Sequence, residues 1–250
     1  MSVIVVSGTG TEIGKTMVTA AMAALAVAAG RSVAVLKPAQ TGLVAGEHGD
    51  AAEAARLAGE AGVVTAVELA RYPDPLAPAT AAQRAGLPPV RAHRVAEAAE
   101  DLAQEHDLVL VEGAGGLLVR LDDRDATLAD AAKLLRAPVL VVAPATLGTL
   151  NSTALTAEAL HARGLEQLGV VIGSWPRRPD LAARCNLADL PRVAGAPLLG
   201  AVPEGVGALS PRAFRRAAPD WLSPRLGGSW DPSAFVATHG TLPGGRPEEG

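Results

Sequence analysis

The stretch VIVVSGTGTEIGKT, from Val3 to Thr16, decides the fold of this chain. Its first four residues are apolar, as in a strand that is buried on both faces of a parallel sheet. A glycine-rich turn follows, and the alanine-rich segment after Gly14 has the composition of a helix. The order strand, glycine loop, helix is the context that a phosphate-binding loop requires. The sequence therefore predicts an α/β fold with a phosphate site near its first strand.

The residue types in this loop suit the binding of phosphate. Glycines let the backbone curl until several N–H groups point at one anion, and the following helix adds its dipole. Lys15 would place its charge on the β and γ phosphates, and the Thr16 hydroxyl would coordinate the magnesium ion that bridges them. The spacing departs from the common pattern, because five residues separate Gly8 from Gly14. A tight turn with a surface lysine is the alternative.

Length and composition favour one domain that binds small molecules. The chain has 250 residues and a net charge of −4, which gives no reason to expect nucleic acid or anionic membrane as a partner. Cys185 is the single cysteine, so an intrachain disulfide is excluded. No signal-peptide pattern occurs, and no apolar stretch is long enough to span a bilayer. We therefore expect a cytoplasmic protein.

Six apolar runs have the character of parallel strands, and helical segments lie between most of them. This alternation predicts a doubly wound, mainly parallel sheet with helices on both faces. Prolines between Arg71 and Val90 predict a connecting segment there. We expect one domain over residues 1–226 and a poorly ordered tail over 227–250, where apolar residues show no periodicity. The predicted strands are Val3–Ser7, Ser32–Lys37, Leu108–Glu112, Pro138–Ala143, Leu168–Gly173 and Pro197–Val202.

Three charged residues are predicted at the edge of the sheet where ligands bind, beyond the carboxyl ends of the strands. Lys37 ends the second predicted strand and either reaches solvent or meets an anion, which the nearby phosphate loop favours. Asp50 begins the pattern Asp-Ala-Ala-Glu, which fits a helix-capping box as well as a metal ligand. Glu112 ends the third predicted strand and precedes glycines, where an acid commonly holds magnesium. A plain loop carboxylate is the alternative for Glu112.

The loop GTGTEIGKT resembles that of the dethiobiotin synthetases, which have this longer spacing and an acidic residue, here Glu12, before a small aliphatic one. Further boxes of that family occur in the same order, and the similarity spans roughly residues 3 to 205. A proline-rich box at Pro75–Ala82 is also similar, with Ala79 where many members have histidine. The other boxes are Lys37-Pro38 with Thr41-Gly42, Val111–Gly116, and Leu147-Gly148 with Asn151, Leu155 and Thr156.

The resemblance implies a P-loop NTPase fold and a homodimeric ligase. Such an enzyme uses Mg²⁺ and ATP, or another nucleoside triphosphate, to close a ureido ring on 7,8-diaminononanoate with carbon dioxide in biotin synthesis. The substrate amine would capture CO₂ as a carbamate, and the γ-phosphoryl group would transfer to the carbamate oxygen. The second amine would then attack and expel phosphate. The protein's task would be to hold two anions in line while neutralising their repulsion.

The resemblance also implies roles for individual residues. Lys37, Lys15 and Thr11 would act in catalysis, and the metal would be held by Thr16, Asp50 and Glu112. Diamine and carbamate would contact Thr11, Glu12, Lys37, Thr41 and Gly115, together with Thr149, Leu150 and Asn151 of the neighbouring subunit. The nucleotide would contact Gly10, Thr11, Glu12, Ile13, Gly14, Lys15, Thr16, Met17, Gly173, Ser174, Trp175, Pro203, Glu204 and Gly205. Because Gly173 replaces an asparagine that commonly reads adenine, we expect backbone groups to recognise the base.

Two other classes of protein share the loop and strand pattern. A partition- or septum-type regulatory ATPase is the main alternative, but those loops carry an additional lysine near their start, and here no lysine precedes Lys15. A cobyrinate-type amidotransferase synthetase would need a glutaminase domain with a cysteine nucleophile. We do not expect that class, because this sequence has neither the length for such a domain nor a suitable context at Cys185.

Overall fold

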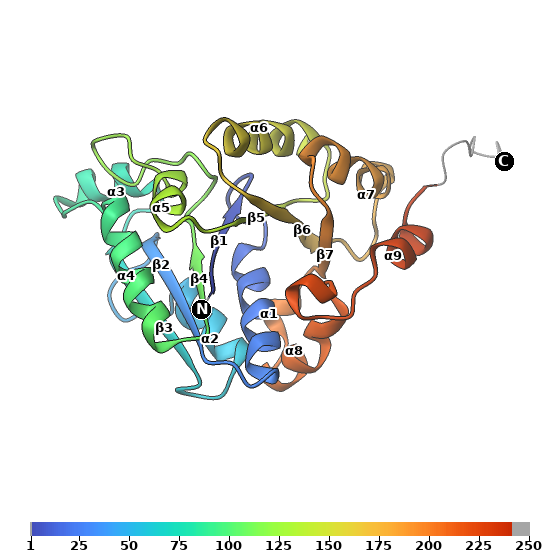
Figure 1. The fold of residues 1–250 in the computed structure, drawn as a ribbon, viewed down its shortest axis with the longest axis horizontal. Coiled ribbons are helices and arrows are strands. Elements are labelled where there is room, and N and C mark those ends of the chain that lie inside the picture. The colour runs from blue at the N-terminus through green and yellow to red at the C-terminus, as the bar shows by residue number, and fades with distance from the viewer. Residues whose placement is uncertain (1, 242–250) are drawn as a thin grey trace.

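The structure, a computed structural model, describes residues 2–241. A central sheet is covered by helices on both sides (Figure 1). Within the described residues seven strands, all paired in parallel, form this sheet in the order β3-β2-β4-β1-β5-β6-β7. The predicted doubly wound sheet is confirmed. The strands are β1 (Ser2–Gly8), β2 (Val33–Thr41), β3 (Val64–Tyr72), β4 (Leu108–Glu112), β5 (Val139–Ala143), β6 (Gln167–Trp175) and β7 (Leu198–Pro203).

Two hydrophobic cores lie between the sheet and its two layers of helices. Helices α1, α2 and α8 pack on one face, while α3 to α7 pack on the other. No helix of residues 2–241 is apolar over a length that would cross a bilayer. The helices are α1 (Lys15–Ala28), α2 (Asp50–Ala58), α3 (Pro78–Ala85), α4 (Ala92–Glu105), α5 (Leu128–Leu135), α6 (Thr149–Ala162), α7 (Leu181–Ala194), α8 (Pro211–Ala217) and α9 (Pro232–His239).

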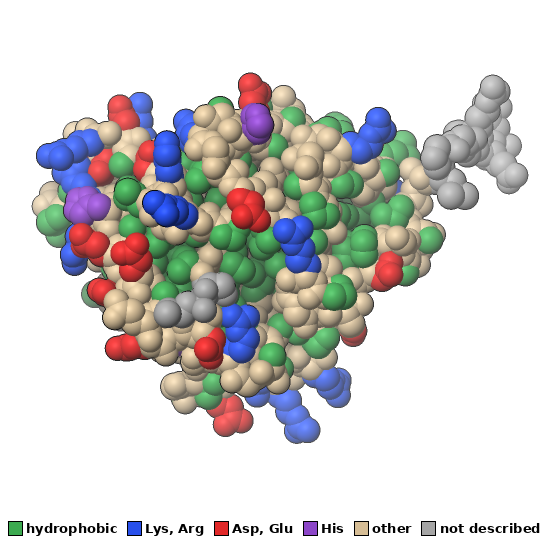
Figure 2. All heavy atoms as spheres, viewed as in Figure 1, with side chains coloured by type: hydrophobic (Ala, Val, Ile, Leu, Met, Phe, Trp, Pro, Cys, Tyr) green, Lys and Arg blue, Asp and Glu red, His purple; other side chains and the backbone are tan. Residues whose placement is uncertain are grey.

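Small side chains build these cores. Alanines of α1 are buried against valines and leucines of the central strands. Strands β1, β4 and β5 have both faces covered, which explains why they read as continuous apolar runs. On the outer surface, Lys and Arg side chains are interspersed with Asp and Glu over the face that Figure 2 shows. Because β1 is the middle strand of the sheet, the P-loop, residues 8–16, which follows β1, lies at the middle of the sheet edge.

Strand β3 was not among the predicted strands. It lies at the edge of the sheet, and most of its side chains are only partly buried, so its sequence VTAVELARY lacks a continuous apolar run. Strand β2 is also longer than predicted. Its pairing with β4 stops at Leu36, but its pairing with β3 continues to Thr41. As a result Lys37 lies within β2, at the point where the neighbouring strand β4 ends.

Residues 227–241, the first part of the segment expected to be a tail, contain helix α9. The Asp231 side chain caps α9 by accepting a hydrogen bond of 2.8 Å from the Ala234 N–H. Trp230 is buried, and its ring centroid lies 5.3 Å from that of Phe235. The Phe235 centroid in turn lies 5.3 Å from that of Trp175 at the end of β6. Aromatic burial therefore holds this segment on the domain, and the rest of the tail, 242–250, lies outside the described residues.

Candidate active site

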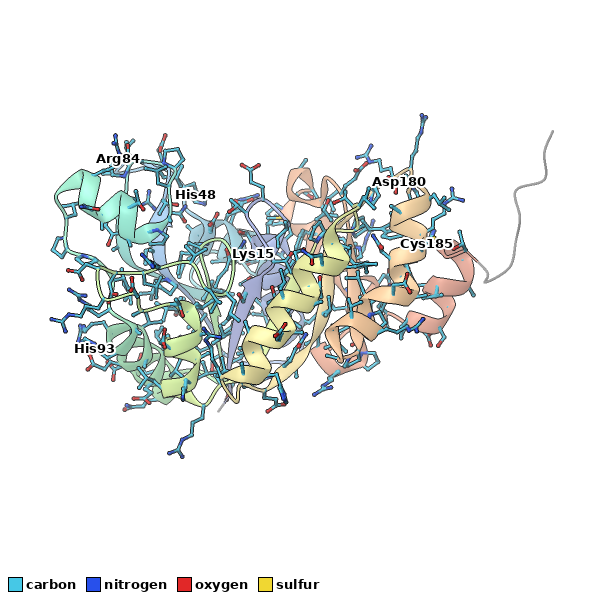
Figure 3. All side chains as sticks on the ribbon, turned by 90° about the horizontal axis from the view of Figure 1, so that it is seen from above. Lys15, His48, Arg84, His93, Asp180 and Cys185 are labelled. Carbon is cyan, nitrogen blue, oxygen red and sulfur yellow. The ribbon has the colours of Figure 1, made fainter. Side chains whose placement is uncertain are left out.

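A cavity of about 910 Å³ lies beyond the carboxyl ends of β1, β2 and β4. Lys15 is near the middle of the molecule, and His48, on the cavity wall, lies toward the side that carries α3 (Figure 3). The P-loop, β2 and the segment after β4 all contribute to the lining. Predicted site residues in that lining are Thr11, Glu12, Ile13, Gly14, Lys15, Thr16, Met17, Lys37, Thr41, Asp50, Glu112 and Gly115.

The P-loop backbone depends on glycine at two points. Gly14 has φ of 92° and caps α1, and a Cβ there would lie 2.1 Å from the carbonyl oxygen of Gly173. A Cβ on Gly8 would lie 2.6 Å from Ile13 Cδ1. Lys15 folds back over the loop, where its Nζ donates to the Gly10 carbonyl at 2.7 Å. Burial, reinforced by the charge of Lys37, lowers the Lys15 pKa to about 8.

Lys37 forms the centre of a charge cluster with Glu112, which is buried, and Asp50, whose side chain is 38% exposed. Its Nζ lies 2.6 Å from Asp50 Oδ2 and 2.8 Å from Glu112 Oε1, and it donates to the Gly113 carbonyl at 3.3 Å. Lys37 is 3% exposed and Glu112 is 1% exposed, so the surface-lysine alternative is wrong. Burial alone would lower the Lys37 pKa, but the charges and hydrogen bonds of Glu112 and Asp50 outweigh it and raise that pKa above its usual value.

Asp50 does not cap its helix, so the capping-box interpretation is wrong. The N-cap of α2 is Gly49, and Asp50 is the first helical residue. The Asp50 N–H donates to the Gln40 Oε1 atom, which lies outside the helix, at 2.9 Å. Because Gln40 satisfies this backbone group, the Asp50 carboxylate is available to Lys37 on the cavity side.

The donor set around Glu112 fits a magnesium ion bound together with a phosphate. Glu112 Oε1 accepts a hydrogen bond of 3.0 Å from the Thr16 hydroxyl, while Glu112 Oε2 is buried without a hydrogen-bond partner in residues 2–241. Those residues contain no group of three Asp, Glu, His or Cys side chains placed for a metal. Two carboxylates and a hydroxyl suit Mg²⁺, which keeps several waters and takes further oxygen ligands from phosphates.

The predicted base-binding segments lie behind the P-loop and do not line the cavity. A Cβ on Gly173 would lie 2.0 Å from the Ile13 carbonyl oxygen, so the two backbones are in contact. The Trp175 carbonyl accepts the Glu204 N–H at 2.8 Å, which joins the ends of β6 and β7. The Trp175 ring is buried against α9. The indole ring of Trp175 therefore belongs to the packing of α9 and not to an open surface.

The start of α6 also lies outside the cavity lining of this chain. Thr149 is buried, and its Oγ1 has no hydrogen-bond partner within residues 2–241. Asn151 is exposed, Leu150 is partly buried, and the N-cap residue Gly148 provides no side-chain cap. The structure of one chain therefore separates these predicted substrate residues from Lys37.

Comparison with known proteins places this chain in a family. The AAA domain family AAA_26 matches residues 2–207. An ATP-dependent dethiobiotin synthetase of Streptomyces avermitilis is 71% identical over 95% of this chain and 98% of that protein. The chain belongs to the dethiobiotin synthetase family. Synthetases of Streptomyces coelicolor and Saccharopolyspora erythraea are 68% and 70% identical over 96% and 92% of the chain, and over 100% and 99% of their own lengths.

Solved structures support the fold of this dethiobiotin synthetase family member. The cell division ATPase MinD of Pyrococcus furiosus aligns with a TM-score of 0.55 and 19% identity over 87% of this chain and 96% of that one. A ParA family ATPase of Chlorobium tepidum has a TM-score of 0.55 and 14% identity over 94% of this chain and 97% of that one. The septum- and partition-type ATPases considered above thus share the fold, while family membership favours the synthetase.

Sequence reasoning missed part of the cavity wall of this synthetase family member. The missed residues come from three segments, the end of β2 with the loop after it, the segment that leads into α3, and the turn after β4. Gln40 lies inside the box that carried the resemblance, and Pro75–Pro78 belongs to the proline-rich box, so both had a signal that was not used. The missed lining residues are Gln40, Gly42, Leu43, His48, Pro75, Leu76, Ala77, Pro78, Ala114 and Val119.

Proposed function

We propose that this protein is a Mg²⁺-dependent synthetase that uses ATP to form dethiobiotin from 7,8-diaminononanoate and carbon dioxide. The observation that carries the proposal is the buried cation of Lys37, held by two carboxylates in the lining of the cavity that the P-loop also lines. Relatives named as ATP-dependent dethiobiotin synthetases support it. The substrates and ATP are small molecules, and the cytoplasm is the compartment that we propose.

Three covalent steps follow from these reactants. A substrate amine forms a bond to the carbon of CO₂ and loses a proton, which gives a carbamate. The carbamate oxygen bonds to the γ-phosphorus as the bond to the ADP oxygen breaks. The second amine then bonds to the carbonyl carbon and loses a proton, and the C–O bond to phosphate breaks as the ring closes. The protein's part in each step is positioning and charge neutralisation.

Lys15 and Lys37 are placed to supply that neutralisation. Lys15 stands at the start of α1, where it would lie along the β and γ phosphates beside the N–H groups of the loop. Lys37 faces the cavity between P-loop and substrate side, where it would lie between carbamate and γ-phosphate. Thr16, Asp50 and Glu112 would hold Mg²⁺, which spreads the phosphate charge when bound.

Other lining residues would form the substrate pocket. Thr11, Glu12, Thr41 and Gly115 share the cavity with Lys37, and we propose that they contact the diamine and the carbamate. Gly115 has φ of 74°, and a Cβ there would lie 3.6 Å from Thr11 Oγ1, so the turn after β4 closes on the P-loop. For the base, we propose contact with backbone groups of Gly173–Trp175 and Pro203–Gly205.

A phosphate-release assay tests the proposed reaction. With ATP and Mg²⁺, phosphate release should require both 7,8-diaminononanoate and bicarbonate, and mass spectrometry should find one dethiobiotin for each phosphate. This stoichiometry follows because the phosphate leaves only when the ring closes. Release of phosphate at the same rate without the diamine would instead indicate a regulatory ATPase and would overturn the proposal.

We also propose that the protein is a homodimer in which α6 of one subunit completes the site of the other. Leu147, just before α6, is 88% exposed, and Leu155 on α6 is also exposed, so this helix offers apolar surface to a partner. The helix N-terminus is suited to the carboxylate of the substrate, and Asn151 could add a side-chain donor. A second copy of the chain would bring this helix start to the cavity that it does not reach within its own subunit.

Mixing two weakly active variants tests the shared site. Lys37→Ala and Asn151→Ala homodimers should each be weak, but a mixed dimer has one site with both defects and one with neither. Random exchange makes about half of the dimers mixed, so about a quarter of all sites should recover activity. If mass spectrometry verifies exchange and activity stays at the level of the parents, Asn151 acts within its own chain.

A further inference from the structure

The loop between β2 and α2, residues 42–49, leads directly into Asp50 and contributes Leu43 and His48 to the cavity wall. Arg71, from the edge strand β3, holds this loop by its carbonyl groups. Its Nη1 donates to the Glu47 carbonyl at 2.6 Å and to the Val44 carbonyl at 3.0 Å. One guanidinium thus fixes two points of the loop.

Glu68 fixes the orientation of that guanidinium. Arg71 Nε donates to Glu68 Oε2 at 2.9 Å, and Arg71 Nη2 donates to Glu68 Oε1 at 2.9 Å, so the pair is bidentate. The two side chains are 25% and 18% exposed. In contrast, the Arg94–Glu97 pair, with the same spacing, is 68% and 51% exposed. Arg71 is therefore a partly buried, multiply bonded group, unlike a solvated surface pair.

The end of the loop rests on this pair. A Cβ on Gly49 would lie 2.0 Å from Glu68 Oε1, 2.9 Å from Arg71 Nη2 and 3.1 Å from Gln40 Oε1. Gly49 has φ of −91°, which any residue can adopt, so its backbone conformation does not require glycine. Glycine is required here because a Cβ would collide with the neighbouring side chains. The Arg71–Glu68 pair therefore packs directly against Gly49, the residue before Asp50. From β2, the Gln40 side chain accepts the hydrogen bond of the Asp50 N–H.

We propose that Arg71 and Glu68 are positioning residues, which hold the loop so that the Asp50 carboxylate stays opposite Glu112 and Lys37. The inference rests on the proposed function, in which Asp50 belongs to the metal site. Arg71 is not among the residues that line the cavity, so it would act without touching the metal or the substrates. Its effect passes through the loop backbone to one carboxylate, and groups that orient metal ligands typically change metal affinity about 10-fold to 100-fold.

Binding of Mn²⁺ in the presence of a non-hydrolysable ATP analogue, followed by electron paramagnetic resonance, tests this role without turnover. Arg71→Met should raise the Kd for Mn²⁺ about tenfold, as expected for a lost orienting group. Affinity for the analogue without metal should be unchanged, and excess Mg²⁺ should restore kcat. Arg94→Met is the control, because Arg94 also pairs with a glutamate three residues away but in an exposed pair. It should leave the Kd for Mn²⁺, the affinity for the analogue and kcat at their wild-type values.

Gly49→Ala provides a second test that keeps every charge. Its Cβ would displace the flexible ends of Glu68, Arg71 and Gln40, so the same loss of Mn²⁺ affinity is expected with the fold retained. An unchanged Kd for Mn²⁺ in a folded Arg71→Met or Gly49→Ala protein would overturn the positioning role. Asp50→Asn tests the metal site separately from the positioning role. Unchanged Mn²⁺ affinity of this variant would remove Asp50 from the metal site, and the positioning role of Arg71 and Glu68 would then be overturned as well.

Discussion

Replacing Glu112 with Gln should lower kcat/KM for dethiobiotin formation roughly a thousandfold, equivalent to about 4 kcal/mol of transition-state stabilisation. The carboxylate accepts from Thr16 through one oxygen, and its other oxygen is buried without a partner in the described residues. Gln keeps the shape and the contact to Lys37 but removes the charge that a magnesium ion requires. In the proposed mechanism, the metal would be needed most during γ-phosphoryl transfer, so kcat should fall together with kcat/KM.

The measurement is steady-state phosphate release over a range of Mg²⁺ concentrations, with thermal unfolding as the check on folding. Glu97→Gln is the matched control, because Glu97 is an exposed partner of Arg94. Near-normal turnover of Glu112→Gln at limiting Mg²⁺ would remove Glu112 from the metal site.

Replacing Lys37 with Gln should lower kcat by about a hundredfold or more while changing the Kd of the nucleotide little. In the proposed mechanism, the negative charge beside Lys37 would be largest in the transition state, where carbamate and γ-phosphate approach each other. The same variant should also unfold more easily without metal, because Glu112 and Asp50 lose the cation between them. Mg²⁺ with nucleotide should then raise its Tm more than that of the wild type.

Calorimetry of nucleotide binding and Tm with and without Mg²⁺ check these two effects of Lys37. Lys133→Gln, an exposed lysine on α5, is the matched control. If nucleotide affinity falls in proportion to kcat, Lys37 is a nucleotide clamp and its proposed role in the transfer step is wrong.

The fold was predictable where consecutive residues of a strand are all buried, because such strands are uninterrupted apolar runs in the sequence. Strand β1, the P-loop and the start of α1 are adjacent in sequence, so local pattern alone identified them. Strand β3 has one neighbour and partly exposed side chains, and its charged Glu68 and Arg71 interrupt the apolar pattern. Helix α9 was missed for another reason, because its Phe235 and His239 pack against Trp175, which lies far away in the sequence.

The site was predictable to the extent that strand ends determine it. The rule that ligands bind beyond the carboxyl ends of parallel strands placed Lys37 and Glu112 at one edge, and the structure brings them within 2.8 Å. The pairing of Asp50 with Lys37 depends on Gln40, whose side chain takes over the helix N–H. The support from Arg71 depends on the register of an edge strand. Such contacts between distant segments leave no periodic signal in the sequence.

The contact between Gly14 and Gly173 limits how the base preference of this protein can be redesigned. An asparagine introduced at 173 would bring a Cβ to 2.0 Å from the Ile13 carbonyl oxygen, while a Cβ on residue 14 would meet the Gly173 carbonyl oxygen at 2.1 Å. Both obstacles are backbone atoms, which cannot rotate away. A single substitution at 173 would therefore distort the phosphate site before it could offer an amide to the base. If this segment binds the base as proposed, the neighbouring Ser174, whose side chain is exposed, is the position for such a change.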